Sequence, residues 1–277
     1  MSQRKTVNEI LEKKKKGERI TMLTAYDYPM ARLIDEAGID IVLVGDSLAN
    51  VVLGLESTKE IGMEEMLHHA KAVNRGVTKA LLVGDMPFGS FHQDSKESVR
   101  NAALFIEDAG CNAVKLEWYD NCLVMAKAIV DFGIPVMGHI GLTPQTADQL
   151  GGFIVQGRDH DTAQRLIEQA RSLQKAGCFS IVLECVPDKL SEIITKSLDI
   201  PTIGIGAGVH CDGQVLVTHD ILGLYDRFRP KFVKQYTNLS EPIKAALESY
   251  KKDVELGHFP SEKYSFSIKK EELEGLL

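Results

Sequence analysis

The sequence predicts an α/β protein: a single (β/α)8 barrel of the TIM type, with a short N-terminal helix and a C-terminal helical extension. Three observations favour this fold. The chain has 277 residues, and one such barrel usually needs roughly 250. Eight apolar segments of strand length alternate with longer amphipathic stretches. No break in composition divides the chain, so residues 1–277 are treated as one domain.

The first element is a short helix, because Thr6 and Glu9 have the spacing of a capping box and apolar residues follow on one face. Strands are predicted where near-continuous apolar runs occur, since parallel strands are buried on both faces. These runs cover residues 20–26, 39–46, 79–85, 112–117, 135–141, 180–186, 201–208 and, more weakly, 214–220.

Helices are predicted in the segments between the strands. Ser95 to Gly110 has a possible cap at Ser95, an apolar stripe and a terminal glycine, and residues 161–177 follow the same pattern. Eight strands with intervening helices favour a closed barrel over an open sheet. Beyond it, a helix opens at Ser240 and ends at Gly257, within an extension of about residues 227–277 whose tail could wrap a neighbouring subunit.

The composition restricts the classes of function and the compartment. A net charge of -7 argues against a nucleic-acid surface, which needs a basic field, and favours a small ligand. No apolar run has the length of a membrane span, and the start of the chain lacks the apolar core of a signal peptide. Five cysteines without a CxxC pair suggest neither a disulfide framework nor a zinc ribbon, so we expect a cytoplasmic protein.

Two predicted strands end in the same way, each as an apolar run followed by Gly-Asp. The aspartates are Asp46 and Asp85. If side chains with the parity of Val44 and Val83 point into the barrel, both carboxylates emerge at equivalent heights and face one site.

The next strand adds charged residues to the same wall. Lys115 and Glu117 are two positions apart, so the pleat places both on one face. Lys115 could simply pair with a nearby acid, but several buried charges are costly unless a cation or ligand compensates them. Asp46, Asp85 and Glu117 supply oxygen ligands, which suit a hard cation such as Mg²⁺. This ion could chelate a 2-oxo acid and stabilise the charge of an enolate.

His139 and Glu184 end the fifth and sixth strands. The strand before Glu184 is otherwise apolar, and a carboxylate removed from water is a better proton acceptor near neutral pH. We therefore take Glu184 as the candidate base. The alternative is a structural glutamate that binds backbone amides.

A long connection follows the third strand, and connections after strands lie on the catalytic face of a barrel. In residues 88–91 a glycine and a serine stand between two phenylalanines. This pattern suits a lid over the site, and an ordered surface loop would explain it equally well.

The strand ends together resemble a known family. The segments are TAYDYPMARLIDEAGIDIVLVGDSLANVVLG (24–54), LLVGDMPFGSF (81–91), AVKLEW (113–118), PVMGHIGLTPQ (135–145), VLECVP (182–187) and TIGIGAG (202–208). They are similar to ketopantoate hydroxymethyltransferases over about residues 7–251. The resemblance implies transfer of a hydroxymethyl group from 5,10-methylenetetrahydrofolate to 3-methyl-2-oxobutanoate, which forms 2-dehydropantoate for pantothenate synthesis.

The resemblance also implies roles for individual residues and an assembly. Asp46, Asp85 and Glu117 match metal ligands for Mg²⁺. Contacts to the 2-oxo acid match Asp46, Ser47, Asp85 and Lys115. Glu184 matches the proton acceptor, and His139 falls on an active-site histidine. The resemblance further implies a cytoplasmic homodecamer.

Two other functions remain open at this point. A magnesium-dependent 2-oxo acid lyase or mutase of the phosphoenolpyruvate mutase type would share the barrel, the acids and the enolate, and a requirement for folate would distinguish it. A non-catalytic barrel that binds a metabolite is disfavoured, because it would not need charged residues at the strand ends.

Overall fold

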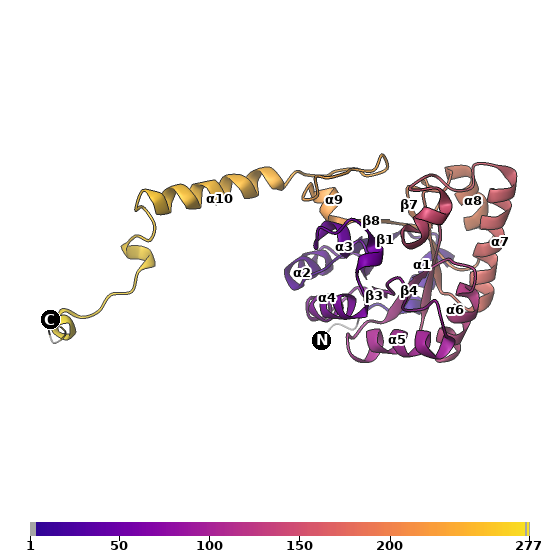
Figure 1. Cartoon of the computed structure of the whole chain (residues 1–277), viewed down its shortest axis with the longest axis horizontal. Coiled ribbons are helices and arrows are strands. Elements are labelled where there is room, and N and C mark those ends of the chain that lie inside the picture. The colour runs from indigo at the N-terminus through magenta and orange to yellow at the C-terminus, as the bar shows by residue number, and fades with distance from the viewer. Residues whose placement is uncertain (1–3, 275, 277) are drawn as a thin grey trace.

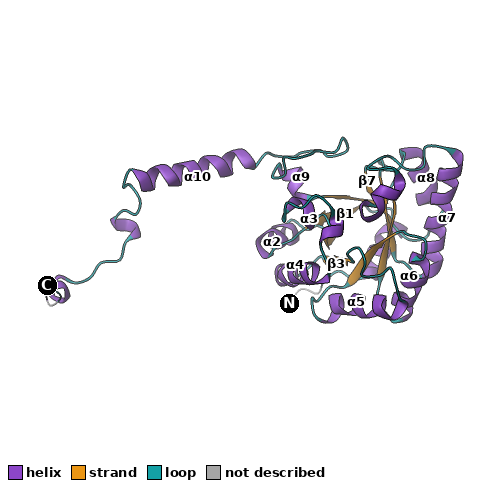
Figure 2. Ribbon diagram, viewed as in Figure 1, coloured by secondary structure: helices purple, strands orange, loops and turns teal. Residues whose placement is uncertain are grey.

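The computed structural model describes residues 4–274 and 276 and confirms the closed parallel barrel. Each strand pairs with the next one along the chain, and the eighth pairs with the first. Figure 2 shows the strands inside a ring of helices. The strands are β1 (Ile20–Thr24), β2 (Ile41–Val44), β3 (Leu81–Asp85), β4 (Ala113–Glu117), β5 (Val136–Gly141), β6 (Ser180–Glu184), β7 (Thr202–Ile205) and β8 (Gly213–Leu216).

The α-helices agree closely with the amphipathic segments of the sequence, and short 3₁₀ helices lie in the connections. The α-helices are α1 (Val7–Lys15), α2 (Tyr28–Glu36), α3 (Leu48–Val51), α4 (Met63–Gly76), α5 (Ser95–Glu107), α6 (Cys122–Asp131), α7 (His160–Ala176), α8 (Asp188–Lys196), α9 (Thr218–Leu222), α10 (Ser240–Glu255) and α11 (Lys270–Glu274). The 3₁₀ helices are η1 (Thr58–Glu60), η2 (Pro144–Leu150) and η3 (Glu262–Tyr264).

Two apolar cores hold the barrel together. The larger core lies between the strands and the outer helices, and the smaller one fills the barrel interior with alternate side chains of the strands. Helix α1 begins with the predicted capping box of Thr6 and Glu9 and contributes the fully buried Ile10 to the interior core. Lys13 and Lys14 of this helix pair with Asp40 and Asp212, both at 2.8 Å, so α1 closes the end of the barrel opposite the site.

One part of the predicted alternation of strands and helices is wrong. No helix separates β7 from β8, because only residues 206–212 join them, and α9 after β8 is a single short helix of five residues. The outer face of β1 and β8 consequently carries a groove of about 780 Å³, lined in part by Thr21, Leu23 and Gln214. The ring of helices is therefore open on this side.

The C-terminal extension leaves the barrel near α9 and projects away from it (Figure 1). The backbone N–H of Leu239 donates to the carbonyl of Leu222 at 2.8 Å, which fixes the start of α10 beside the end of α9. Helix α10 begins at Ser240 as predicted and ends at Glu255, two residues before Gly257, yet none of its residues is buried. Its apolar face of Ile243, Leu247, Tyr250 and Val254 is exposed. No helix within the described residues is both long and apolar enough to cross a lipid bilayer.

Candidate active site

The predicted site residues gather at the carboxyl ends of the strands. We call the six charged residues the strand-end cluster: Asp46, Asp85, Lys115, Glu117, His139 and Glu184. All except Glu184 are at most 6% exposed. The alternation of buried side chains explains most of this placement. Ala113, Met137 and Val182 lie in the interior core, so residues two or four positions further along β4, β5 and β6 also point inward.

Asp46 lies at the site as predicted, but the backbone geometry that directs its side chain there differs from the prediction. Leu43 lies in the barrel interior, whereas Val44 packs outward against the helices, so the predicted inward parity of Val44 is wrong. The register also pairs Leu43 with Val83, which offsets Asp46 by one residue from Asp85. Strand β2 ends at Val44, and the turn that follows redirects Asp46 so that its backbone N–H lies 3.2 Å from Asp85 Oδ2.

Lys115 and Asp85 form the central ion pair of the cluster. The ammonium nitrogen donates to Asp85 Oδ1 at 2.6 Å and to Oδ2 at 2.7 Å. Burial raises the pKa of Asp85 against the opposing effect of Lys115, and Asp46 and Glu117 raise it further. Burial alone would lower the pKa of Lys115, but these three acids outweigh burial and raise it. Lys115 is therefore a fixed positive charge among carboxylates.

His139 lies between two glutamates. Its Nδ1 is 3.4 Å from Glu117 Oε1 and its Nε2 is 3.2 Å from Glu184 Oε2, although the angles depart from hydrogen-bond geometry. Burial and Lys115 would lower the pKa of His139, but the two glutamates outweigh them and raise it to about 9. The imidazole is consequently protonated at neutral pH and links Glu117 to Glu184.

Glu184 is less enclosed than its apolar strand suggested, because its side chain is 15% exposed and faces a charged imidazole. The backbone around it is constrained. Cys185 has a φ of 49°, unusual for a residue with a Cβ. Gly141 has a φ of 96°, and a Cβ there would lie 2.2 Å from the carbonyl oxygen of Glu184. Only glycine lets β5 end this close to β6.

Sequence reasoning missed Gln145, which is fully buried and connects three strand ends. Its Nε2 donates to Asp46 Oδ2 at 2.9 Å and to the carbonyl of Met86 at 3.1 Å, and its backbone N–H donates to Glu117 Oε2 at 2.9 Å. Tyr26 was missed as well, and its hydroxyl shares a 2.8 Å hydrogen bond with Ser47 Oγ. Both belong to segments that follow strands, where polar residues are candidates for the site.

The donor set is suited to a hard cation, but the side chains do not form a complete cage. Glu117 Oε1 is buried and has no hydrogen-bond partner, and both oxygens of Asp85 face Lys115. In residues 4–274 and 276, no three His, Cys, Asp or Glu side chains are grouped as a ready-made metal site. A magnesium ion held here by one or two of these carboxylates would need waters and substrate oxygens for its remaining positions.

Comparison with known proteins identifies the family of the chain. The family model for ketopantoate hydroxymethyltransferase matches residues 4–262. The 3-methyl-2-oxobutanoate hydroxymethyltransferase of Syntrophomonas wolfei is 55% identical over 99% of both chains. The enzyme of the same name from Heliobacterium modesticaldum is 54% identical over 100% of both. Among solved structures, a phosphonopyruvate hydrolase has the same fold, with a TM-score of 0.62, 13% identity and coverage of 98% of this chain and 94% of that one. The chain therefore belongs to the ketopantoate hydroxymethyltransferase family of transferases.

Proposed function

We propose that the chain transfers the hydroxymethyl group of 5,10-methylenetetrahydrofolate to 3-methyl-2-oxobutanoate, with Mg²⁺ as cofactor, and so forms 2-dehydropantoate. The observation that carries the proposal is the strand-end cluster, in which a fixed ammonium group lies among buried carboxylates. Membership of the ketopantoate hydroxymethyltransferase family supports this reaction. The cluster supplies groups that can bind a 2-oxo acid, remove its C3 proton and balance the charge of the resulting enolate.

The charge balance of the cluster favours a divalent cation. Four carboxylates outnumber two cationic side chains, Lys115 and His139, in a largely buried site, and burial raises the pKa of Asp85 and Glu117 against ionisation of all four. A 2-oxo acid adds a further negative charge, so a compensating ion is needed. Asp46 and Asp85 would hold Mg²⁺, with Glu117 as the third carboxylate. When bound, the ion would polarise the 2-oxo carbonyl and stabilise the enolate.

The protein's own groups then divide the remaining tasks. Glu184 takes the proton from C3, and its partial exposure leaves it accessible to the substrate. Lys115 offsets charge on the substrate carboxylate or the enolate oxygen. Ser47 contacts the 2-oxo acid, and its hydrogen bond to Tyr26 fixes the direction of its hydroxyl. His139 orients Glu184 through its Nε2. The enolate carbon then bonds to the methylene carbon of the iminium form of the folate, and the π electrons of the C=N bond pass to the nitrogen. Water then supplies the hydroxyl group at that carbon as its bond to the folate nitrogen breaks, which releases 2-dehydropantoate and tetrahydrofolate.

A deuterium-exchange experiment separates these steps. Incubation with Mg²⁺ and 3-methyl-2-oxobutanoate in D₂O should place deuterium at C3 without folate, and addition of 5,10-methylenetetrahydrofolate should give 2-dehydropantoate. Glu184→Gln should slow the exchange by about 10²–10⁴-fold, the usual contribution of a positioned base. Glu168→Gln, on the exposed face of α7, is the matched control and should exchange normally. Unchanged exchange in Glu184→Gln would exclude this residue as the base.

The phosphoenolpyruvate mutase type of lyase or mutase has only the shared fold in its support. Product formation that requires folate excludes it. A non-catalytic barrel would show neither C3 exchange nor transfer.

We also propose that copies of the chain associate, and the homodecamer and the cytoplasmic location remain predictions. Association is supported by two unpartnered apolar surfaces in the described part of the chain: the exposed face of α10 and the groove along β1 and β8. Light scattering tests this directly. Removal of residues 240–277 should lower the number of copies in the assembly. An unchanged number of copies would show that other surfaces hold the copies together.

A further inference from the structure

A cavity of about 410 Å³ lies on the outer rim of the barrel beside β4 and β5, and the strand-end cluster does not account for it. Its walls are the loop after β3, the loop after β4, the 3₁₀ helix η2 and the first turns of α7. Ligand pockets in proteins typically measure about 300–1,000 Å³. The cavity is thus large enough for a second ligand, additional to a small 2-oxo acid held at the strand ends.

One end of the cavity is a stack of aromatic rings. His92 lies over Tyr119 with the ring centroids 4.3 Å apart and the planes tilted by only 26°. The Phe88 ring lies beside His92 with the centroids 4.8 Å apart and the planes tilted by 55°. Burial lowers the pKa of His92, so its ring is neutral at neutral pH and acts as an aromatic surface. Lys59 lies 5.5 Å from the centre of the Phe88 ring and is paired with Asp148. Such a stack suits a flat heteroaromatic ring.

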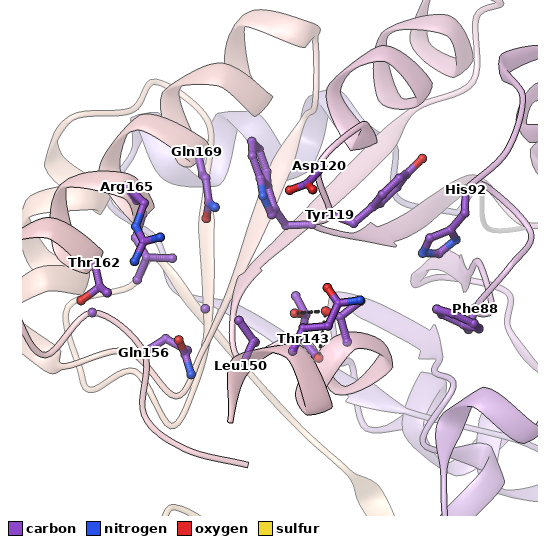
Figure 3. A pocket seen from close by; sticks show the side chains of 16 residues that line it. Phe88, His92, Tyr119, Asp120, Thr143, Leu150, Gln156, Thr162, Arg165 and Gln169 are labelled. Carbon is purple, nitrogen blue, oxygen red and sulfur yellow. Dashed lines mark hydrogen bonds between the residues drawn. The ribbon is translucent and has the colours of Figure 1, made fainter. Parts of the chain in front are cut away.

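The opposite end of the cavity is polar and unpaired. Figure 3 shows Arg165 and Gln169 of α7 across the cavity from Phe88 and His92. Within the described residues, neither side chain has a hydrogen bond or ion pair to another residue, although both line the cavity. Asp120 is the single acidic side chain in the lining, and it lies beside Tyr119 at the aromatic end. The unpaired guanidinium at the far end is therefore free to bind a carboxylate.

The aromatic end is the one next to the strand-end cluster. Phe88 follows Asp85 by three residues, and Tyr119 follows Glu117 by two. Thr143 and Thr146 line the cavity on either side of Gln145, which donates to Asp46. Arg165, by contrast, lies on a helix outside the ring of strands. A ligand bound along the cavity would place its aromatic part towards the cluster and its other end towards solvent.

We propose that this cavity binds the folate co-substrate, with its aromatic part against Phe88, His92 and Tyr119 and a carboxylate of its tail at Arg165. The proposal rests on the function proposed above. The carbon to be transferred is attached to the heteroaromatic part of the folate, so this part must lie nearest the enolate. Asp120 can accept hydrogen bonds from the amino and ring N–H groups of that heteroaromatic part. The loop of residues 88–91 then forms one wall of the co-substrate site.

The single tryptophan of the chain makes binding directly measurable. Trp118 lines the cavity, so quenching of its fluorescence by tetrahydrofolate reports binding without any need for turnover. Arg165→Met removes a charged hydrogen bond to the tail, and we expect tetrahydrofolate to bind at least about tenfold more weakly. The KM for 5,10-methylenetetrahydrofolate should rise by the same factor. Because Arg165 is exposed and has no partner in the described structure, folding should be unaffected.

Arg171→Met is the matched control, since Arg171 is exposed on the same helix but does not line the cavity. It should bind tetrahydrofolate like the wild type. Exchange at C3 of 3-methyl-2-oxobutanoate without folate should be unchanged in both variants. If the wild type exchanges and transfers while Arg165→Met binds tetrahydrofolate normally, the proposed site is wrong and the proposed function stands. If the wild type produces no 2-dehydropantoate, the function fails and the folate site with it.

Discussion

Gln145 connects the strand ends, and its replacement by leucine should disturb both stability and catalysis. Gln145→Leu keeps the side-chain size but removes two donated hydrogen bonds, one to the carboxylate of Asp46 and one to the carbonyl of Met86. A bond to a charged group contributes about 1.5–3 kcal/mol and a neutral one about 1 kcal/mol. Because both acceptors are buried, we expect the free energy of unfolding to fall by about 2.5–4 kcal/mol.

The catalytic effect should exceed the structural one. A residue that orients a metal ligand typically changes metal affinity or activity by about 10–100-fold, so Mg²⁺-dependent C3 exchange should fall by that factor in the folded variant. Urea denaturation measures the stability, and exchange is assayed well below the unfolding midpoint. Gln164→Leu is the control, because its side chain makes one exposed hydrogen bond on α7. A Gln145→Leu protein as stable and as active as this control would refute the bridging role.

Three further predictions follow from contacts elsewhere in the fold. Gly141→Ala should destabilise the protein by more than about 2 kcal/mol and slow C3 exchange, because the new Cβ would meet backbone atoms. Gly133 has a similar φ of 98° but open space around it, so Gly133→Ala should lower the free energy of unfolding by only about 1 kcal/mol. Denaturant titrations measure both values. Burial alone would raise the pKa of Asp35, but hydrogen bonds from residues 78–80 outweigh burial and lower it. Asp35 therefore contributes its full stabilisation above its unfolded-state pKa of about 4, and this stabilisation is lost as the pH falls through the folded-state pKa. The stability gap between wild type and Asp35→Asn should accordingly shrink in acid, and a gap that is constant with pH would contradict this assignment. Lys115→Met leaves the buried Asp85 without its ion-pair partner, so we expect the free energy of unfolding to fall by about 3–5 kcal/mol. The KM for the 2-oxo acid should rise as well. Unchanged values of both quantities would argue against the ion pair.

The strands and most of the strand-end cluster could be predicted because they depend on local periodicity. Lys115 and Glu117 share a face through the pleat alone, and His139 and Glu184 follow from the same alternation in β5 and β6. The prediction for Asp46 relied on the same rule beyond the end of its strand. There the direction of the side chain depends on the turn after Val44, which periodicity does not describe.

Three features that strand periodicity does not describe were not predicted. Gln145 reaches Asp46 across 99 positions of sequence, so nothing near it in the sequence indicates its partner. The cap of α5 is Asp94 rather than the expected Ser95, because the Asp94 carboxylate accepts the N–H of Lys96. No helix lies between β7 and β8, although the apolar runs and the stretches between them predicted a helix after each strand. Segment length was the available signal, since seven residues are too few for a covering helix.

The central claim is that carboxylates from separate strands share one divalent cation, which makes proton removal from C3 feasible. The most direct test is C3 exchange of 3-methyl-2-oxobutanoate in D₂O, measured without folate while Mg²⁺ is titrated into chelator-treated wild type and Asp46→Asn. We expect wild-type exchange to rise from near zero and to saturate at one bound ion per chain, and the variant to require at least about tenfold more Mg²⁺. Equal exchange by both proteins in excess chelator would contradict the account.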